Sequence, residues 1–231
     1  MSGASGKRCV FITGGTGYVG RDLILQLLQR GHQVLALVRP GSEQKLPPGC
    51  VEVSGNALDP NTYVSHIRPA DTFVQLVGVS HPNPAKAAEF RRIDLASAVG
   101  AVNASLQAGV PHFVYVSVAQ PAPVMKAYVE CRAQCEKRIR EAGLNATILR
   151  PWYVLGPGHR WPYALLPLYW LMRLIPATRD GASRLGLITL EQMVRALVHA
   201  VENPSTGVRT VEVPEIRASS DFSTIRAPSA A

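Results

Sequence analysis

A glycine-rich turn near the start of the chain restricts the possible folds more than any other sequence feature. Gly14, Gly17 and Gly20 follow an apolar run at residues 8–13, and residues 18–30 then place leucines at helical spacing. Gly14 permits a tight turn, Gly17 lets the backbone approach a pyrophosphate, and Gly20 lets the helix pack on the strand. The pattern predicts a strand, a phosphate-binding turn, and a helix whose first N–H groups attract an anion.

Short apolar runs alternate with helical patterns along most of the chain. Strands are expected at residues 8–13, 33–38, 51–53, 72–77, 113–117, 146–149 and 208–213, and helices at 18–30, 60–67, 89–108, 127–141 and 190–202. This alternation predicts an α/β fold with a Rossmann-type, doubly wound parallel sheet that helices cover on both faces. The ligand of such a sheet lies at the carboxyl ends of the strands.

The composition fits one soluble domain over residues 1–231. Apolar residues make up 47% of the chain and charged residues 17%, which excludes a disordered protein. Lysine and arginine outnumber aspartate and glutamate by 24 to 16, a net charge of 24 − 16 = +8, yet they are scattered. The charge therefore favours an anionic ligand or surface, and nucleic acid is not an expected partner.

The four cysteines are too few for a disulfide framework in a chain of this length. Cys131 and Cys135 are expected to share one helix face, but two further ligands at metal-binding spacing are not evident. We therefore expect free thiols in a reducing, cytoplasmic environment and no metal site.

Residues 152–186 are rich in tryptophan, tyrosine and leucine and are expected to form a small C-terminal lobe. Trp152, Trp161 and Trp170 all fall within this segment. One interpretation is core that covers the carboxyl edge of the sheet; the other is an apolar slot for a lipid-like or quinone-like ligand. No apolar stretch reaches the roughly 20 residues that span a bilayer, so peripheral membrane contact is the remaining membrane hypothesis. Residues 217–231 are expected to form a flexible tail.

The end of the second expected strand indicates which cofactor the site prefers. Sites specific for NAD usually carry an acidic residue there to bind the ribose 2′-hydroxyl. This chain has Arg39, with Lys45 close behind and no carboxylate expected nearby to repel a phosphate. A guanidinium pairs well with a 2′-phosphate, so NADP(H) is expected in preference to NAD(H).

Further motifs extend this pattern over almost the whole chain. They are Gly55-Asn56-Ala57, Leu76-Val77-Gly78, Tyr115-Val116-Ser117, Tyr128, Glu136, Leu149-Arg150-Pro151 and Gly156-Pro157-Gly158. With them the chain resembles the extended or atypical short-chain dehydrogenases/reductases, and most of all the small NAD(P)H-binding proteins related to the complex I accessory subunit and NmrA-type proteins. The resemblance implies that the cofactor contacts Gly14, Thr16, Gly17, Tyr18, Val19, Arg39, Asn56, Ala57, Val77, Gly78, Ser117, Tyr128, Pro151 and Tyr153.

The resemblance also implies a catalytic trio of serine, tyrosine and lysine. In it the serine orients the substrate carbonyl, the tyrosine hydroxyl passes a proton as acid/base, and the lysine holds the nicotinamide ribose and lowers the tyrosine pKa. Ser117 and Tyr128 occupy the first two positions, but Arg132 stands where the family has lysine. Arginine keeps the positive charge but stays protonated, so it cannot take part in a proton relay.

Other candidate residues lie outside this trio. His159, Trp152 and Trp161 are expected to border the substrate. Asp59 and Asp94 are expected at the surface or as helix caps.

Three functional hypotheses follow. The first is an NADP(H)-dependent oxidoreductase acting on a hydrophobic carbonyl or quinone-like substrate. The second is a non-catalytic NADP(H)-binding redox sensor or assembly factor, which the arginine at the lysine position favours. The weakest is a nucleotide-sugar epimerase, because the apolar segment suits a sugar nucleotide poorly. A homodimer fits the family resemblance but no residue requires it.

Overall fold

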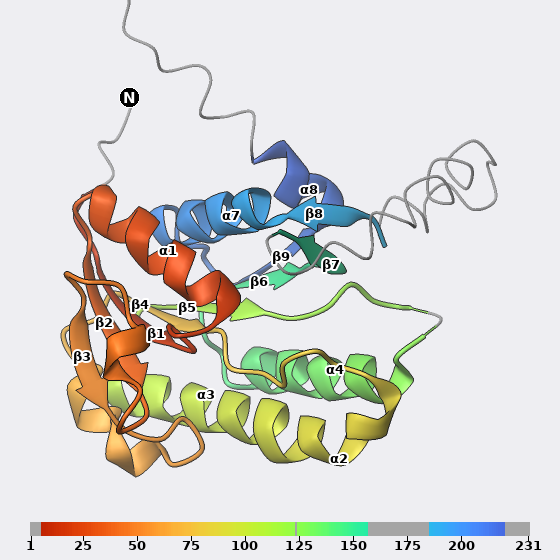
Figure 1. Cartoon of the computed structure of the whole chain (residues 1–231), viewed down its shortest axis with the longest axis horizontal. Helices are drawn as coiled ribbons and strands as arrows, with labels where there is room; N and C mark the ends of the chain where they lie inside the picture. The colour runs from red at the N-terminus through yellow and green to blue at the C-terminus, as the bar shows by residue number, and fades with distance from the viewer. Residues whose placement is uncertain (1–5, 123, 157–184, 220–231) are drawn as a thin grey trace, which may run out of the picture.

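The computed structural model of the chain describes residues 6–122, 124–156 and 185–219, and a parallel sheet runs through its centre (Figure 1). The sheet has seven strands in the order β3-β2-β1-β4-β5-β6-β9, with every neighbouring pair parallel. The strands are β1 (Cys9–Thr13), β2 (Gln33–Val38), β3 (Val51–Ser54), β4 (Thr72–Gln75), β5 (His112–Val116), β6 (Ala146–Arg150) and β9 (Val208–Glu212). The predicted α/β, doubly wound architecture is confirmed.

Helices cover both faces of the sheet, which explains why its central strands β1 and β4 are buried along their whole length. On one face lie α1 (Tyr18–Gln29), α7 (Leu190–Glu202) and α8 (Val213–Ala218), and on the other α3 (Ala96–Ala108) and α4 (Lys126–Glu141) (Figure 1). Side chains alternate between these two cores along each strand. Val10 and Ile12 of β1 pack beneath α1 and α7, whereas Phe11 packs in the core on the α3 side.

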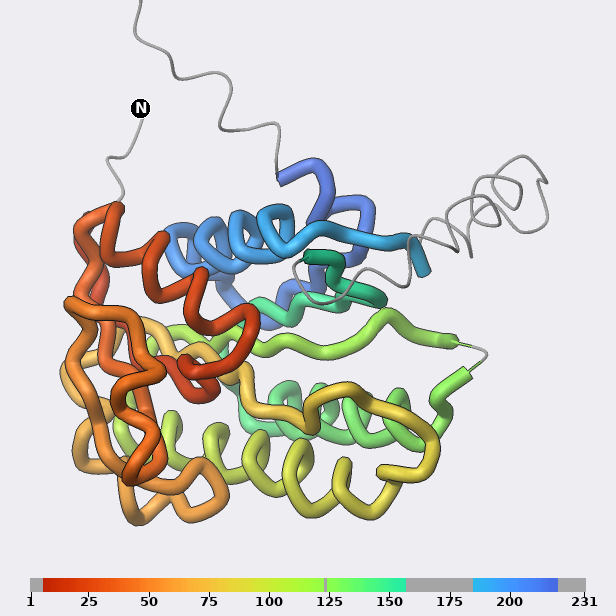
Figure 2. The backbone as a smooth tube through the Cα atoms, in the orientation of Figure 1, coloured from red at the N-terminus to blue at the C-terminus, as the bar shows by residue number. Residues whose placement is uncertain are grey.

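The expected helix at residues 89–108 is interrupted by a wider turn. The chain passes from α2 (Ala87–Glu89) through the π-helical segment η5 (Phe90–Leu95) directly into α3, as Figure 2 shows. The expected helix at 60–67 is instead two short 3-10 helices, η2 (Pro60–Thr62) and η3 (Val64–His66). Asp59 caps η2 as expected, since its side chain accepts a hydrogen bond from the Asn61 N–H. Two further 3-10 turns are η1 (Glu43–Lys45) and η4 (Pro84–Lys86).

Two short strands at the ends of the predicted lobe were not expected. β7 (Tyr153–Leu155) pairs in parallel with β8 (Leu187–Thr189), and most of the lobe between them lies outside the described residues. Arg217 and Ala218, the first two residues of the predicted flexible tail, belong instead to α8, and residues 220–231 lie outside the described residues. The Arg217 guanidinium donates hydrogen bonds to the Leu187 carbonyl, which fixes α8 against β8. In the described residues, every helix is too short or too polar to cross a membrane.

Leu197 on α7 provides a test of the core. Its side chain is fully buried beneath α1, so we expect Leu197→Ala to lower the free energy of unfolding by about 3 kcal/mol. Leu106→Ala on α3 is the matched control, because that leucine is 46% exposed, and we expect a change within about 0.5 kcal/mol. Equal losses in chemical denaturation would contradict the core described above.

Candidate nucleotide site

The carboxyl ends of β1 and β4 mark the point where the chain switches direction across the sheet. From β1 the strand order runs outward to β2 and β3 on one side, and from β4 to β5, β6 and β9 on the other. Such a switch point leaves a crevice for a ligand. Here it holds a cavity of about 420 Å³, which is lined by the segments that follow β1, β2, β3 and β4.

The glycine turn has the geometry that a pyrophosphate requires. Gly14 has φ +77°, and a Cβ there would lie 2.9 Å from the carbonyl carbon of Leu76. A Cβ on Gly20 would collide with the Gly14 oxygen, so both close approaches require glycine. Gly17 is the N-cap residue of α1 and has no side chain to cap the helix, which leaves the first N–H groups of the helix available to an anion. These residues fit the diphosphate of a dinucleotide.

Arg39 is the residue that the sequence analysis expects to select a cofactor with a ribose 2′-phosphate. It follows β2, is exposed, and lines the cavity. No ion pair joins it to a carboxylate of the described residues. The expectation that no carboxylate lies nearby is wrong, however: Glu43 accepts a hydrogen bond from the Gly41 N–H at 3.0 Å. That bond holds the carboxylate against the turn.

Asp94 is buried, and the expectation of a surface or capping residue is wrong. The π-helical turn carries its side chain into the core, where Oδ1 lies 2.6 Å from Nη2 of Arg132. Arg132 also donates to the Val116 carbonyl at 2.9 Å and to the Tyr115 hydroxyl at 3.1 Å. Burial opposes the charge, but Tyr115, Tyr128 and Asp94 hold the pKa of Arg132 well above its usual value. The guanidinium therefore stays protonated behind the cavity.

Tyr128, the expected acid/base, packs on two neighbours. Its half-buried ring lies 5.0 Å from the Phe90 ring, and the carbon of the Arg132 guanidinium lies 5.1 Å from its centroid. Burial raises the pKa of Tyr128 and outweighs the lowering effect of Arg132. In these surroundings the phenol favours its protonated form, and its catalytic role stays a prediction.

Ser117, the expected substrate-orienting residue, donates its hydroxyl hydrogen to Glu136 at 2.6 Å. Glu136 is buried and also binds Arg150, with Nη2 to Oε2 at 2.6 Å, while Arg150 reaches Glu212 of β9 at 2.8 Å. Burial raises the pKa of Glu136, but hydrogen bonds from Arg150 and Ser117 and the charge of Arg150 outweigh it, so the pKa is lowered. This cluster ties α4, β5, β6 and β9 together.

The structure brings some of the expected cofactor residues together at the cavity and not others. Those that line it are Gly14, Thr16, Gly17, Arg39, Asn56, Ala57, Val77 and Gly78. Ser117, Tyr128, Pro151 and Tyr153 lie outside that lining, Val19 packs on the core, and the Tyr18 hydroxyl lies against Gly156. Of the expected substrate residues, Trp152 packs edge-on against Tyr153, and His159 and Trp161 lie outside the described residues.

The sequence interpretation missed several cavity residues. Ser42, Ser80, Lys86, Glu89 and Ile93 also line the cavity. Lys86 donates to the Ser80 carbonyl at 2.8 Å, which closes the loop after β4 over the site. The sequence signal for this turn is Asn83-Pro84, a residue pair typical of a capped helical start. In the structure the Asn83 side chain accepts a hydrogen bond from the Ala85 N–H.

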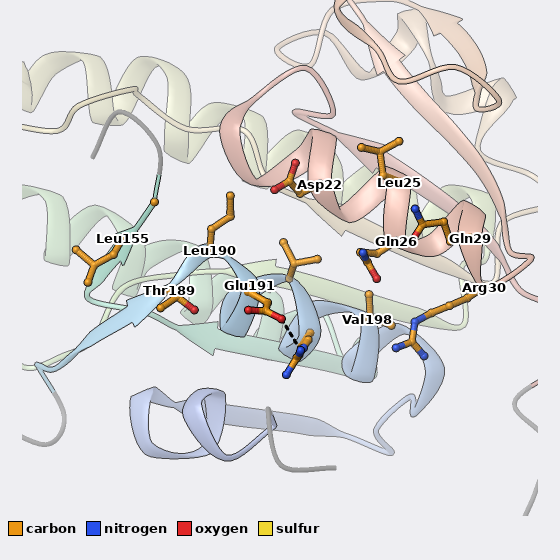
Figure 3. Close-up of a pocket in the computed structure, with 13 residues that line it drawn as sticks. Asp22, Leu25, Gln26, Gln29, Arg30, Leu155, Thr189, Leu190, Glu191 and Val198 are labelled. Carbon is orange, nitrogen blue, oxygen red and sulfur yellow. Dashed lines mark hydrogen bonds and ion pairs between the residues drawn. The ribbon is translucent and has the colours of Figure 1, made fainter. Parts of the chain in front are cut away.

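A second cavity, of about 590 Å³, lies between α1 and α7 (Figure 3). Asp22, Leu25 and Gln26 of α1 face Leu190 and Val198 of α7 across it. The glycine turn and all three expected catalytic residues lie outside its lining. The cavity at the switch point is therefore the candidate nucleotide site.

Comparison with known proteins identifies the family of the chain. Residues 14–160 match the family described as NAD(P)H-binding. The chain is 28% identical over 210 residues to a ceramide reductase of Caulobacter vibrioides, covering 90% of this chain and 65% of that protein. It is 27% identical over 144 residues to the photosystem II assembly factor Ycf39 of Synechocystis, covering 61% of this chain and 43% of that protein. The chain thus spans less than two thirds of either relative.

Solved structures agree on the fold. The crystal structure of the Bordetella bronchiseptica enzyme WbmH in complex with NAD+ superposes with a TM-score of 0.67 at 20% identity. That superposition covers 98% of this chain and 85% of the WbmH chain. MoeE5 in complex with UDP-glucose and NAD gives a TM-score of 0.66 at 22% identity, covering 95% of this chain and 82% of that chain.

Glu136 predicts a specific dependence of stability on pH. Its pKa in the folded protein lies below the ordinary 4.5, so its stabilising contribution is present above pH 4.5 and is lost as the pH falls through the folded-state value. We expect Glu136→Gln to lower the free energy of unfolding at pH 7 by about 2 kcal/mol and to flatten its decline in acid. Chemical denaturation at several pH values measures both effects.

The matched control is Glu141→Gln on the same helix, since that side chain is 53% exposed. It is expected to leave the acid profile unchanged. An unaltered profile in Glu136→Gln as well would show that the buried carboxylate does not set the acid stability.

Proposed function

The chain belongs to the NAD(P)H-binding short-chain dehydrogenase/reductase family, and we propose that it is an NADP(H)-dependent oxidoreductase acting on a hydrophobic carbonyl or quinone-like substrate. The observation that carries the cofactor preference is Arg39, exposed at the end of β2 and lining the cavity. An unpaired guanidinium at this position binds a 2′-phosphate through charge-assisted hydrogen bonds. The other charged residues of the lining, Lys86 and Glu89, are of opposite sign, so Arg39 leaves the cavity with a net positive charge.

Three segments of the chain would bind different parts of the cofactor. The turn at Gly14 and Gly17 and the start of α1 would hold the pyrophosphate, and Arg39 the 2′-phosphate. The loop at residues 77–80 would bound the cofactor on the β4 side. When bound, the nicotinamide ring donates or accepts a hydride. Tyr128 keeps its proton because burial raises its pKa, which suits a group that donates a proton to a reduced carbonyl oxygen.

The substrate class rests on the relatives and on the apolar C-terminal segment. Several matched relatives are named as reductases, among them the ceramide reductase and a 3-diazoavenalumate denitrifying reductase of Streptomyces that is 28% identical over 227 residues. The first is named for a lipid substrate. Trp152 begins the apolar segment and packs against the core that includes α7. These observations favour a hydrophobic carbonyl compound.

A second candidate function is a cofactor-binding assembly factor or redox sensor without turnover. It is favoured by the Ser117 hydroxyl, whose hydrogen is already donated to Glu136. A serine that donates to a buried carboxylate cannot donate the same hydrogen to a substrate carbonyl. The match to an assembly factor points in the same direction.

Arg39 provides the test of cofactor preference. We expect wild-type protein to bind NADPH at least tenfold more tightly than NADH, and Arg39→Ala to lose that difference, because about 1.4 kcal/mol per tenfold is within the range of a charge-assisted hydrogen bond. Calorimetric titration with both nucleotides measures it. Arg138→Ala, on the exposed face of α4 beside Asn103, is the control and should keep the preference. Equal affinities in the wild type would refute selection for NADP(H).

Tyr128 separates the two candidate functions. With a carbonyl and quinone panel, we expect Tyr128→Phe to lower the NADPH oxidation rate at least 100-fold, because a general acid contributes about that much. The NADPH affinity should change less than threefold, since the hydroxyl lies outside the cavity lining. Turnover that survives in Tyr128→Phe rules out this acid, and a wild type that binds NADPH but oxidises it with no substrate favours the assembly factor or sensor.

A further inference from the structure

We propose that the buried Asp94–Arg132 ion pair is a positioning device for the cofactor: it fixes the loop at residues 77–79 and thereby sets the affinity for the nucleotide. The proposal rests on the proposed function, because the loop lines the cavity assigned to the cofactor. It gives Arg132 a role other than the ribose contact that its place in the sequence implies. It also gives a role to Asp94, which the sequence analysis placed at the surface.

The pair reaches three segments that are separate in the sequence. Asp94 sits in η5 and accepts a hydrogen bond from the Val79 N–H through Oδ2 at 2.9 Å, while its other oxygen pairs with Arg132 of α4. Arg132 donates through Nη1 to the Val116 carbonyl at the end of β5. The ion pair therefore links the loop after β4 to both α4 and the next strand of the sheet.

Gly78 shows how closely the pair supports the loop. A Cβ at this position would collide with Nη2 of Arg132 and lie 3.1 Å from Oδ1 of Asp94. The cavity lies against the same residues, since Val77, Gly78 and Val79 all line it. One short stretch of backbone thus separates the cofactor cavity from the ion pair.

The burial of the two groups fixes their mutual geometry. The Asp94 side chain is 0% exposed and that of Arg132 8% exposed, so either charge alone would be left without a partner in the core. The planar guanidinium suits this role because two of its nitrogens reach acceptors on different segments at once. Both partners must stay in place, and the Val79 N–H stays directed at the carboxylate.

The test is the double variant Asp94→Leu/Arg132→Met, which removes both charges and keeps the apolar volume. We expect its thermal midpoint to stay near that of the wild type, while the Kd for NADPH rises about tenfold, because a charge-assisted hydrogen bond to the loop is lost. Hydrogen exchange at the Val79 amide should become faster at the same time, since its acceptor is gone. If the pair had only a structural role, a double variant that kept its thermal midpoint would also keep the wild-type Kd for NADPH and the wild-type exchange rate at the Val79 amide. That result would overturn the proposal.

Two further variants complete the experiment. Arg30→Met/Glu202→Leu removes an ion pair of 3.3 Å between α1 and α7, away from the loop, and should leave both readouts unchanged. Asp94→Asn keeps the size but leaves one oxygen for two donors, so it should shift both readouts in the direction of the double variant even if the latter does not fold. Wild-type readouts in Asp94→Asn would overturn the proposal.

The outcome is separable from that of the proposed function. If the wild type binds neither NADPH nor NADH, the proposed function fails. The ion pair could still be shown to hold the loop in that case. The supporting result would be hydrogen exchange at the Val79 amide that is slow in the wild type and fast in the variants. Unchanged exchange would overturn the proposal.

Discussion

A parallel sheet must be covered on both faces, because the connections between its strands cross those faces as helices. In this chain the turns after β1, β2, β3 and β4 therefore all lie at the carboxyl ends of the strands. The strand order changes direction between β1 and β4 at that end of the sheet. Gly14, Arg39, Asn56 and Gly78 lie far apart in the sequence, yet they line one cavity for this reason. The two faces are filled by core, so the polar backbone that lines this cavity lies at the carboxyl ends of the strands.

One helix, α4, carries two of the buried charged residues that lie next to the carboxyl ends of the strands. α4 carries Arg132 and Glu136 one turn apart, and each is buried and paired with a group of opposite charge. Arg132 faces the loop after β4, and Glu136 faces Ser117 and Arg150 at the ends of β5 and β6. The two pairs stabilise neighbouring parts of the site by the same means, so the position of α4 determines where both parts lie.

The features that follow from local sequence were predictable. The glycine turn and the strand before Arg39 depend on neighbouring residues, and the structure contains both. Asp94 was not predictable, because a π-helical turn shifts its helical phase and its partner comes from another helix. β7 and β8 have three residues each, too few for a period to be visible, and the direction of the Ser117 hydroxyl depends on Glu136, which only the fold brings near.

The last strand of the sheet has a consequence for how the chain is made. β9 covers the edge of β6, and Glu212 on it completes the ion pair with Arg150. Until residues 208–212 leave the ribosome, β6 presents unpaired backbone N–H and C=O groups along an apolar strand. A nascent chain that stalls before that point therefore exposes a template for pairing with other chains, and its folding without aggregation depends on the synthesis of β9.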